Sequence, residues 1–340
     1  MSIADVIDRL LDEEDLGRDG ATQALSRIMA GQIDPIQTAA FLIGLRAKGE
    51  TASELAGLVT AVRDHSTKVQ VDHEVYVDTC GTGGGVSTFN VSTAAAFVVA
   101  GAGVVVAKHG NRSSTSKSGS ADVLEALGAV VDLPSDAVTR SIDETGIGFM
   151  FAPSFHPAFR HVVPVRRALA VRTVFNILGP LANPAGVRHQ VIGIADRAYL
   201  DRIAMAIAEL GTDRTILVSS DDGMDELSTS APSEVVEITA EGVRRWRFDP
   251  ADLRIPPPPH DSPPGGEPAQ NADVIRRILE GGQGPSTDIV ALNAAAGLVA
   301  AGVVDDIADG YDLARSTIES GHAAERLVQF SDLTTRLAST

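Results

Sequence analysis

The sequence contains few residues of three kinds: cysteine, aromatic residues and lysine. Its single cysteine, Cys80, cannot form an internal disulfide, and nothing in the sequence indicates secretion. Aromatic residues make up only 4% of the chain, which argues against stacking platforms for single-stranded nucleic acid. Apolar runs are too short to span a bilayer, and the acidic, amphipathic N-terminus resembles neither a signal peptide nor a transit peptide. We therefore expect a cytoplasmic protein with no membrane contact.

Positive charge is also scarce. Lys and Arg total 28 against 45 Asp and Glu, and the net charge of −17 argues against nucleic acid or an anionic membrane as a partner. Only four residues are lysines, namely Lys48, Lys68, Lys108 and Lys117. Two of these four lie in one polar stretch, so an anionic substrate would find cations concentrated there.

The length and the hydrophobic pattern predict two domains. A chain of 340 residues exceeds one typical domain. Residues 1–68 are predicted to form a small helical domain, with a capping box at Thr51–Glu54. From residue 69 to residue 340, short β-branched segments alternate with helices, which predicts an α/β domain with a mostly parallel central sheet and flanking helices. The expected strands lie at 75–77, 104–106, 147–151, 190–194 and 215–219, and a hairpin is expected over 234–248.

Two polar loops follow the first two expected strands. The first contains Gly81-Thr82-Gly83-Gly84-Gly85 and leads to a helix expected to open at Ser92 or Thr93. The second contains Lys108, Arg112 and Lys117, with four hydroxyl residues between the last two. Glycine-rich backbone and helix N-termini bind anions through their N–H groups, and ligands collect at the carboxyl ends of parallel strands. The two loops therefore predict a site for a ligand with more than one phosphate.

A third loop, Asp221–Glu226, carries four carboxylates after another expected strand. These carboxylates would repel a phosphate ligand unless a cation lies between them. Mg²⁺ is commonly held by one or two carboxylates together with substrate phosphates. The alternative is a solvated acidic turn, and the position of the loop at the presumed ligand edge favours the metal.

Arg166 and Arg167 lie on an expected helix among apolar residues. An arginine fork can bind a carboxylate through two hydrogen bonds, although a structural salt bridge is at least as common in this pattern. His156, His161 and His189 have no metal-ligand spacing and are expected to be structural. The sequence has no P-loop, no complete dinucleotide fingerprint and no Gly-X-Ser-X-Gly motif.

In combination, these motifs resemble the anthranilate phosphoribosyltransferases of tryptophan biosynthesis. The resemblance covers most of the chain, and its motifs occur in the family's order: Phe41–Glu50, Thr51–Ser66, the Gly-Thr-Gly-Gly loop, Asn90–Thr93, Lys108–Arg112, Ser116–Gly128, Val165–Pro184, Met224–Ser228 and Leu292–Ala296. It implies the α plus α/β fold shared with pyrimidine nucleoside phosphorylases, in which part of residues 160–180 packs on the helical domain. It also implies a homodimer formed through the helical domain.

The resemblance assigns roles to individual residues. Phosphoribosyl pyrophosphate (PRPP) would be held by Gly81, Gly84, Gly85, Thr88, Asn90, Val91, Ser92, Thr93, Lys108, His109, Gly110, Asn111, Arg112, Ser113, Ser114, Thr115 and Ser120. Anthranilate would be held by Gly81, Asn111 and Arg166, with Arg166 facing its carboxylate. Mg²⁺, expected as two ions per subunit, would be held by Ser92, Asp225 and Glu226.

The implied reaction is the displacement of pyrophosphate from the ribose C1 of PRPP by the amine of anthranilate. An aniline is already neutral and nucleophilic at pH 7, so the reaction needs no strong base. Catalysis is expected to come from Mg²⁺ on the leaving pyrophosphate and from positioning by Lys108, His109 and Asn111. His109 is also a candidate for assisting the departure of the proton.

The sequence departs from the family at Gly85, where the family usually has an aspartate in a loop one residue longer. The missing carboxylate predicts that Gly85→Asp raises kcat/KM, unless the shorter loop is complete in itself. Three other functions remain open. They are a divergent phosphoribosyltransferase for a related aromatic amine, a nucleoside phosphorylase of the same fold, and a non-enzymatic binding protein.

Overall fold

The computed structural model describes residues 1–86, 88–113, 117–258 and 265–339, and its N-terminal segment is helical. The helices of this segment are α1 (Ile3–Leu11), α2 (Gly17–Met29), α3 (Pro35–Lys48) and α4 (Ala52–Asp64). The predicted capping box is present, because the Thr51 side chain accepts a hydrogen bond from the Glu54 N–H and Glu54 accepts one from the Thr51 N–H. α4 therefore begins where the sequence signal predicts.

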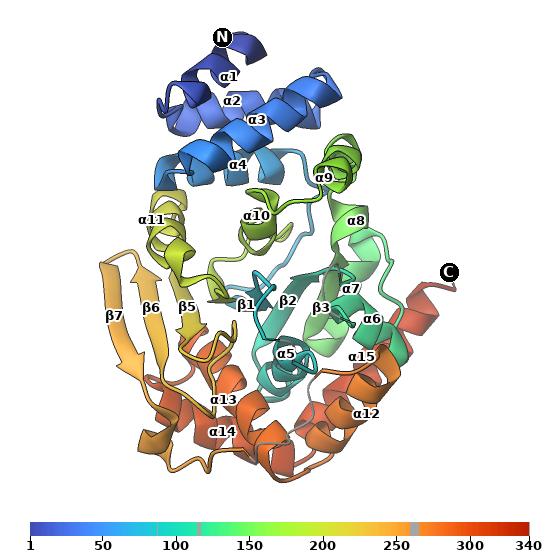
Figure 1. Cartoon of the computed structure of the whole chain (residues 1–340). Coiled ribbons are helices and arrows are strands. Elements are labelled where there is room, and N and C mark those ends of the chain that lie inside the picture. The colour runs from blue at the N-terminus through green and yellow to red at the C-terminus, as the bar shows by residue number, and fades with distance from the viewer. Residues whose placement is uncertain (87, 114–116, 259–264, 340) are drawn as a thin grey trace.

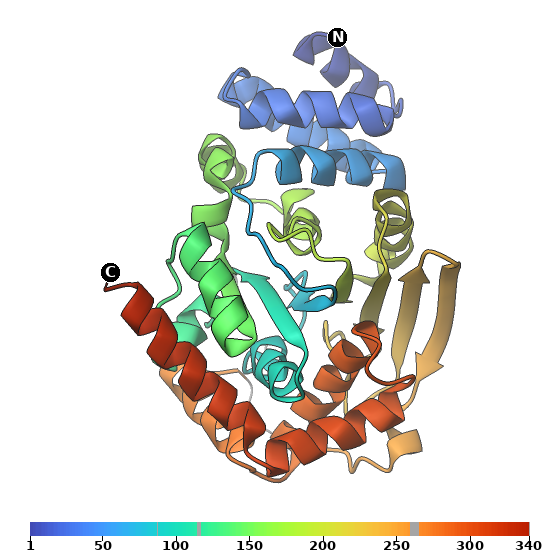
Figure 2. The same ribbon diagram turned by 180° about the vertical axis from the view of Figure 1, so that it is seen from behind.

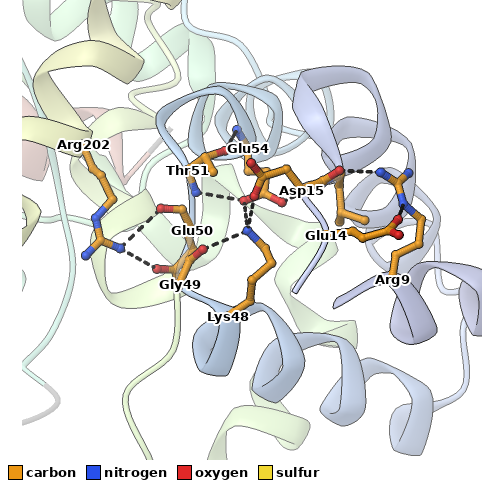
Figure 3. Close-up of polar contacts among 10 residues, drawn as sticks. Arg9, Glu14, Asp15, Lys48, Gly49, Glu50, Thr51, Glu54 and Arg202 are labelled. Carbon is orange, nitrogen blue, oxygen red and sulfur yellow. Dashed lines mark hydrogen bonds and ion pairs between the residues drawn. The ribbon is translucent and has the colours of Figure 1, made fainter. Parts of the chain in front are cut away.

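A buried ion pair fixes the connections between these helices (Figure 3). Lys48 Nζ lies 2.9 Å from Glu54 Oε2 and 2.7 Å from Asp15 Oδ1, and the Lys48 and Glu54 side chains are 4% and 0% exposed. Glu54 also accepts a hydrogen bond from the Leu16 N–H at 2.9 Å. Because the buried carboxylate has partners on two connections, it holds α1–α2 and α3–α4 in one arrangement.

The described part of the remaining chain is built around a seven-stranded sheet in the order β3-β2-β1-β4-β5-β6-β7. Its strands are β1 (Tyr76–Gly81), β2 (Val105–Gly110), β3 (Ile147–Phe151), β4 (His189–Gly193), β5 (Arg214–Ser220), β6 (Ser233–Thr239) and β7 (Gly242–Phe248). Strands β1 to β5 are parallel, and β6 and β7 pair antiparallel as the predicted hairpin. The predicted combination of a helical N-terminal part and a mostly parallel α/β part is confirmed.

Helices connect and cover these strands (Figures 1 and 2). They are α5 (Val91–Gly101), α6 (Ser120–Ala126), α7 (Ser135–Thr145), α8 (Ala152–Phe155), α9 (Val163–Leu169), α10 (Phe175–Leu181), α11 (Leu200–Leu210), α12 (Pro268–Leu279), α13 (Pro285–Ala300), α14 (Ile307–Glu319) and α15 (His322–Leu337). Short 3₁₀ turns lie at Pro157–His161, Arg197–Tyr199 and Pro250–Leu253. Among the described residues, no helix combines the length and the apolar character that crossing a membrane requires.

Alternate strand residues enter two separate cores. Val191 and Ile216 join a core with α5 and the C-terminal helices, whereas their neighbours Ile192 and Leu217 join a core with α4, α10 and α11. The sheet therefore lies between the N-terminal helices and the helices α13 to α15 (Figure 1). This burial on both faces explains why the parallel strands appear in the sequence as short continuous apolar runs.

Residues 162–182 return to the N-terminal helices. Val165 of α9 and Phe175 of α10 lie in the same apolar core as α2, α3 and α4. Arg63 at the end of α4 donates to the Leu181 carbonyl at 3.0 Å. Arg46 of α3 donates to the Arg172 carbonyl. The segment between α9 and α10 is thus attached to the helical part of the chain.

Candidate active site

The glycine-rich loop joins the carboxyl end of β1 to α5. Gly83 and Gly84 have φ values of 62° and 85°, a backbone region that favours glycine. The Gly83 N–H donates to Asp225 Oδ2 at 2.9 Å, and a Cβ on Gly81 would lie 2.5 Å from the same oxygen. The glycines therefore let the loop pack directly against the carboxylate loop. Ser87 lies outside the described residues.

Asn90 connects this loop to the second loop and to α12. It has left-handed backbone angles (φ 68°, ψ 47°) immediately before α5. Its Nδ2 donates to the Ser118 carbonyl at 2.9 Å, and its Oδ1 accepts from Asn271 Nδ2 at 2.9 Å. Since both ends of the amide have partners, an unfavourable backbone conformation is held in place.

α5 begins at Val91, one residue earlier than the sequence pattern predicts. Ser92 and Thr93 lie in its first turn, where the Thr93 N–H donates to the Asn90 carbonyl at 2.9 Å and the earlier N–H groups have no carbonyl one turn back in the helix. Such an N-terminus beside a glycine loop is suited to an anion. The structure therefore brings Val91, Ser92 and Thr93 to the edge of the sheet at which β1 ends.

Lys108 lies in β2 and not in the loop that follows, so the predicted loop position is wrong. It is 3% exposed, and its Nζ donates to the Thr79 carbonyl of β1. Burial lowers the pKa of Lys108, and the buried carboxylate of Asp78 opposes that shift. A buried lysine needs such a partner, and Asp78 occurs on the neighbouring strand. The sequence pattern did not reveal that these two charges lie on neighbouring strands, because the two residues are distant along the chain.

His109 also belongs to β2 and pairs with His156, which follows α8. The two Nε2 atoms lie 3.2 Å apart. Burial lowers the pKa of His109 to about 3 and that of His156 to about 4. Both rings are therefore neutral near pH 7, and one Nε2–H donates to the other Nε2. Neither imidazole contributes a positive charge to an anion site.

The charge of Arg112 is engaged by neighbouring carboxylates. Its two terminal nitrogens lie 2.6 Å and 2.7 Å from the oxygens of Glu125, and one of them lies 2.9 Å from Asp122 Oδ1. The Glu125 and Asp122 carboxylates raise the pKa of Arg112. The side chain is 49% exposed, so a phosphate has access to it. Such a phosphate would share the guanidinium with the two carboxylates.

The rest of the second loop turns from β2 into α6. Gly110 ends β2, and Ser120, the first residue of α6, donates its hydroxyl to the Asn111 carbonyl at 3.3 Å. The Ser113 N–H donates to Asp122 Oδ2 at 3.1 Å. These bonds hold Asn111 and Ser113 next to the start of α6, close to the end of β2 at Gly110. The predicted ligands Ser114 and Thr115 lie outside the described residues.

Ser92, Asp225 and Glu226 line one small cavity of about 20 Å³, together with Asn293 and strand residues. This volume has room for roughly one water-sized occupant. Thr88 Oγ1 donates to Glu226 Oε1 at 2.9 Å. Glu226 Oε2 is buried and has no hydrogen-bond partner in the described part of the chain. Among the described residues, one carboxylate oxygen therefore has no partner at a cavity with room for about one water or ion.

The donor set of this cavity fits Mg²⁺. Burial and the adjacent Asp225 carboxylate raise the pKa of Glu226, and a cation between the two would remove the repulsion. No group of three or more His, Cys, Asp or Glu residues suited to a metal occurs in the described ranges. Two carboxylates and a hydroxyl are nevertheless typical of Mg²⁺, which completes its coordination with water and substrate phosphates.

Arg166 lies at the end of a row of rings that starts at His109. His156 stacks on Phe159 with the ring centroids 5.0 Å apart, and Phe159 meets Phe175 edge-on at 5.4 Å. The Arg166 guanidinium lies 5.4 Å from the Phe175 centroid. No carboxylate of the described residues forms an ion pair with Arg166. The half-buried guanidinium is therefore available for a ligand carboxylate, and the alternative of a structural salt bridge is not observed within the described ranges.

Two further residues at the site were not singled out by the sequence pattern as contacts of these loops. Arg172 places its guanidinium against Gly84 of the glycine loop. Asn293 of α13 lines the cavity with Asp225. Asn293 lies in the Leu292–Ala296 motif and Arg172 in the Val165–Pro184 motif, but neither motif indicated a contact with these loops.

Comparisons with known proteins agree with this geometry. Residues 4–66 match the helical bundle domain of a glycosyl transferase family, and residues 73–324 match the a/b domain of that family. The anthranilate phosphoribosyltransferase of Thermomicrobium roseum is 48% identical over 99% of this chain and 98% of that protein.

Solved structures show the same similarity. The crystal structure of anthranilate phosphoribosyltransferase from Thermus thermophilus superposes with a TM-score of 0.91 at 40% identity, over 97% of this chain and 99% of that one. The Saccharomyces cerevisiae enzyme in complex with PRPP and Mg has a TM-score of 0.90 at 28% identity, over 98% of both chains. The yeast enzyme has also been solved with 4-fluoroanthranilate. The chain therefore belongs to the anthranilate phosphoribosyltransferase family.

Proposed function

We propose that the protein transfers the phosphoribosyl group of PRPP to the amine of anthranilate, giving N-(5-phosphoribosyl)anthranilate and pyrophosphate. This is the second step of tryptophan biosynthesis from chorismate. One observation carries the proposal. At the carboxyl edge of the sheet, Ser92 of α5 and two carboxylates, one with an oxygen that has no partner among the described residues, line one cavity, and the glycine loop packs on one of these carboxylates.

In this proposal PRPP lies along the glycine loop, with its phosphates against the first turn of α5 and the turn that contains Asn111. Ser92, Asp225 and Glu226 hold Mg²⁺, which neutralises charge on the departing pyrophosphate when bound. We propose two Mg²⁺ ions per subunit, and a Mn²⁺ titration with PRPP present would measure that number. Without a cation, the same carboxylates would repel the ligand.

Anthranilate would lie between Gly81, Asn111 and Arg166, with its carboxylate on the Arg166 guanidinium. Its amine attacks the ribose C1 as pyrophosphate leaves, and the surplus proton then departs from nitrogen. The two Nε2 atoms of the neutral His109–His156 pair bond to each other, so the pair adds no charge next to the amine. Because no strong base is needed, the chain's main contribution is to hold two substrates in the reactive orientation.

The decisive experiment follows anthranilate fluorescence after addition of PRPP and Mg²⁺. Loss of fluorescence that requires both additions and stops in EDTA is expected. Parallel reactions with other aromatic amines test the divergent acceptor, and phosphorolysis of thymidine tests the nucleoside phosphorylase. Turnover of thymidine without turnover of anthranilate would contradict the proposal.

We also propose that the protein is a homodimer formed through its helical part. Exposed apolar side chains on α3 and on α9, which contacts α3, support this, since Ile36 is 80% exposed, Ile43 39% and Val163 41%. A second copy of the same surface would cover it in a two-fold arrangement.

A further inference from the structure

Asn293 is the one polar side chain on the apolar part of α13. Apart from Asn293, all residues from Ile289 to Ala300 are Ala, Val, Leu, Ile or Gly, and the whole stretch is buried. A buried amide is costly unless its donors and acceptor find partners. Asn293 is therefore present either for a specific contact or at a net cost to the helix.

The Asn293 amide holds the backbone of Leu227 from both sides. Its Oδ1 accepts from the Leu227 N–H at 2.9 Å, and its Nδ2 donates to the Leu227 carbonyl at 3.0 Å. The second Nδ2 hydrogen is donated to the Ile289 carbonyl at 2.9 Å. Both N–H donors of the amide are thus used. Leu227 directly follows Glu226, so the chain is fixed immediately after the carboxylate pair.

The carboxylate pair needs such an anchor. Glu226 is part-buried next to Asp225 with its Oε2 atom fully buried, and neither carboxylate forms an ion pair with a Lys or Arg of the described residues. Repulsion between like charges and the tendency of a carboxylate to hydrate both favour movement of the loop into solvent. The side chain of Leu227 is also fully buried, but an apolar side chain alone does not fix the direction of the peptide groups that carry Glu226.

We propose that Asn293 is a positioning residue that fixes Asp225 and Glu226 in the geometry required for Mg²⁺ and PRPP. This inference rests on the proposed metal role of the two carboxylates. Asn293 lines the same cavity as both of them, so its two bonds to Leu227 set the position of the loop at the cavity itself. Mutation of a residue that orients metal ligands typically lowers metal affinity by about tenfold to a hundredfold.

The test compares Asn293→Leu and Asn293→Ser with Thr287→Val. Thr287 is a matched control, because it is buried on the same helix and its hydroxyl donates to the Gly282 carbonyl at 2.8 Å, away from the carboxylate loop. Binding of Mn²⁺ is measured by electron paramagnetic resonance with PRPP present and anthranilate absent. Both Asn293 variants are expected to bind Mn²⁺ about tenfold more weakly or worse, while Thr287→Val stays within about twofold of the wild type.

Steady-state kinetics give a second readout. The KM for PRPP and the Mg²⁺ midpoint should rise in the Asn293 variants, with the KM for anthranilate nearly unchanged, which a general loss of stability would not produce. The double variant Asp225→Asn with Glu226→Gln is the reference for a lost metal site. If it loses Mn²⁺ while the foldable Asn293 variants bind like Thr287→Val, the positioning role is overturned. If it binds Mn²⁺ like the wild type, the proposed metal site itself is overturned.

Discussion

At Gly85 the glycine loop leaves no room for a side chain. A Cβ there would lie 2.5 Å from the Gly223 carbonyl oxygen and 3.2 Å from Ala195 Cβ. The same carbonyl accepts a hydrogen bond from the Val86 N–H at 3.2 Å. The short loop is thus closed by its own backbone against the carboxylate loop. This geometry favours the second of the two sequence interpretations, in which the loop without the family's aspartate is complete in itself.

We therefore expect Gly85→Ala and Gly85→Asp to lower kcat/KM, by about tenfold or more, because either side chain must push the two loops apart near the reacting atoms. A third variant, Gly85→Asp with one residue inserted to lengthen the loop, should recover part of the loss. Steady-state kinetics at saturating Mg²⁺ compare the three variants with the wild type. A Gly85→Asp enzyme that equals or exceeds the wild type would contradict this interpretation.

Arg166 and Arg167 are adjacent arginines that the structure distinguishes. Arg166 is half-buried against Phe175, and Arg167 is exposed at the next position of α9. Arg166→Ala should raise the KM for anthranilate by about tenfold to a hundredfold, because a charge-assisted hydrogen bond contributes roughly 1.5–3 kcal/mol. The KM for PRPP should change little. Arg167→Ala is the matched control, and an equal effect of the two variants would show that Arg166 is misassigned.

At the scale of elements, the His109–His156 pair joins β2 to the segment after α8 and makes their packing sensitive to pH. The folded-state pKa values of about 3 and about 4 lie below the ordinary value of 6.5. The stability that comes from keeping both rings neutral is therefore fully present above about pH 6.5. It is lost as the pH falls from there towards 4, because the unfolded chain then binds more protons.

Each histidine should contribute a slope of up to about 1.4 kcal/mol per pH unit in that window. His156→Phe keeps the stack on Phe159 but cannot be protonated, so its free energy of unfolding should fall less steeply between pH 6.5 and 4.5. The exposed His322→Gln is the control and should keep the wild-type slope. Urea unfolding at several pH values gives the slopes, and equal slopes for His156→Phe and the wild type would count against the buried pair.

The elements themselves were largely predictable from the sequence. Capping signals and apolar periodicity are local, so the start of α4 at its Thr51 cap and the β6–β7 hairpin follow from residues that are neighbours in the chain. The signals that decide where a strand ends are not local in this sense. β2 runs on to Gly110 because it pairs with β3 as far as Gly110 opposite Phe151, and no pattern within residues 104–110 contains that information.

At the scale of the whole molecule, some parts of the site follow from local sequence signals, and others depend on contacts between residues that are distant in the chain. The sequence predicted that the glycine loop, the first turn of α5 and the carboxylate loop lie at one edge of the sheet, since parallel strands run in one direction. The sequence could not show that Arg112 donates hydrogen bonds to Glu125, nor that Asn293 of a distant helix accepts one from the Leu227 N–H. These pairings depend on how α6 and α13 pack after the chain has folded.

The proposed homodimer is the property that belongs to the whole molecule. In a two-fold interface each substitution occurs twice, and an added carboxylate would be buried without a partner. Ile36→Glu and Val163→Glu should therefore weaken the dimer by roughly a hundredfold or more.

Met205→Glu and Val328→Glu are matched controls, because these side chains are 53% and 58% exposed on α11 and α15. Sedimentation velocity should give twice the chain mass of 35.4 kDa for the wild type and the controls, and one chain mass for the first two variants. A wild type that sediments as a single chain, or α3 and α9 variants that remain dimeric, would rule out this surface as the interface.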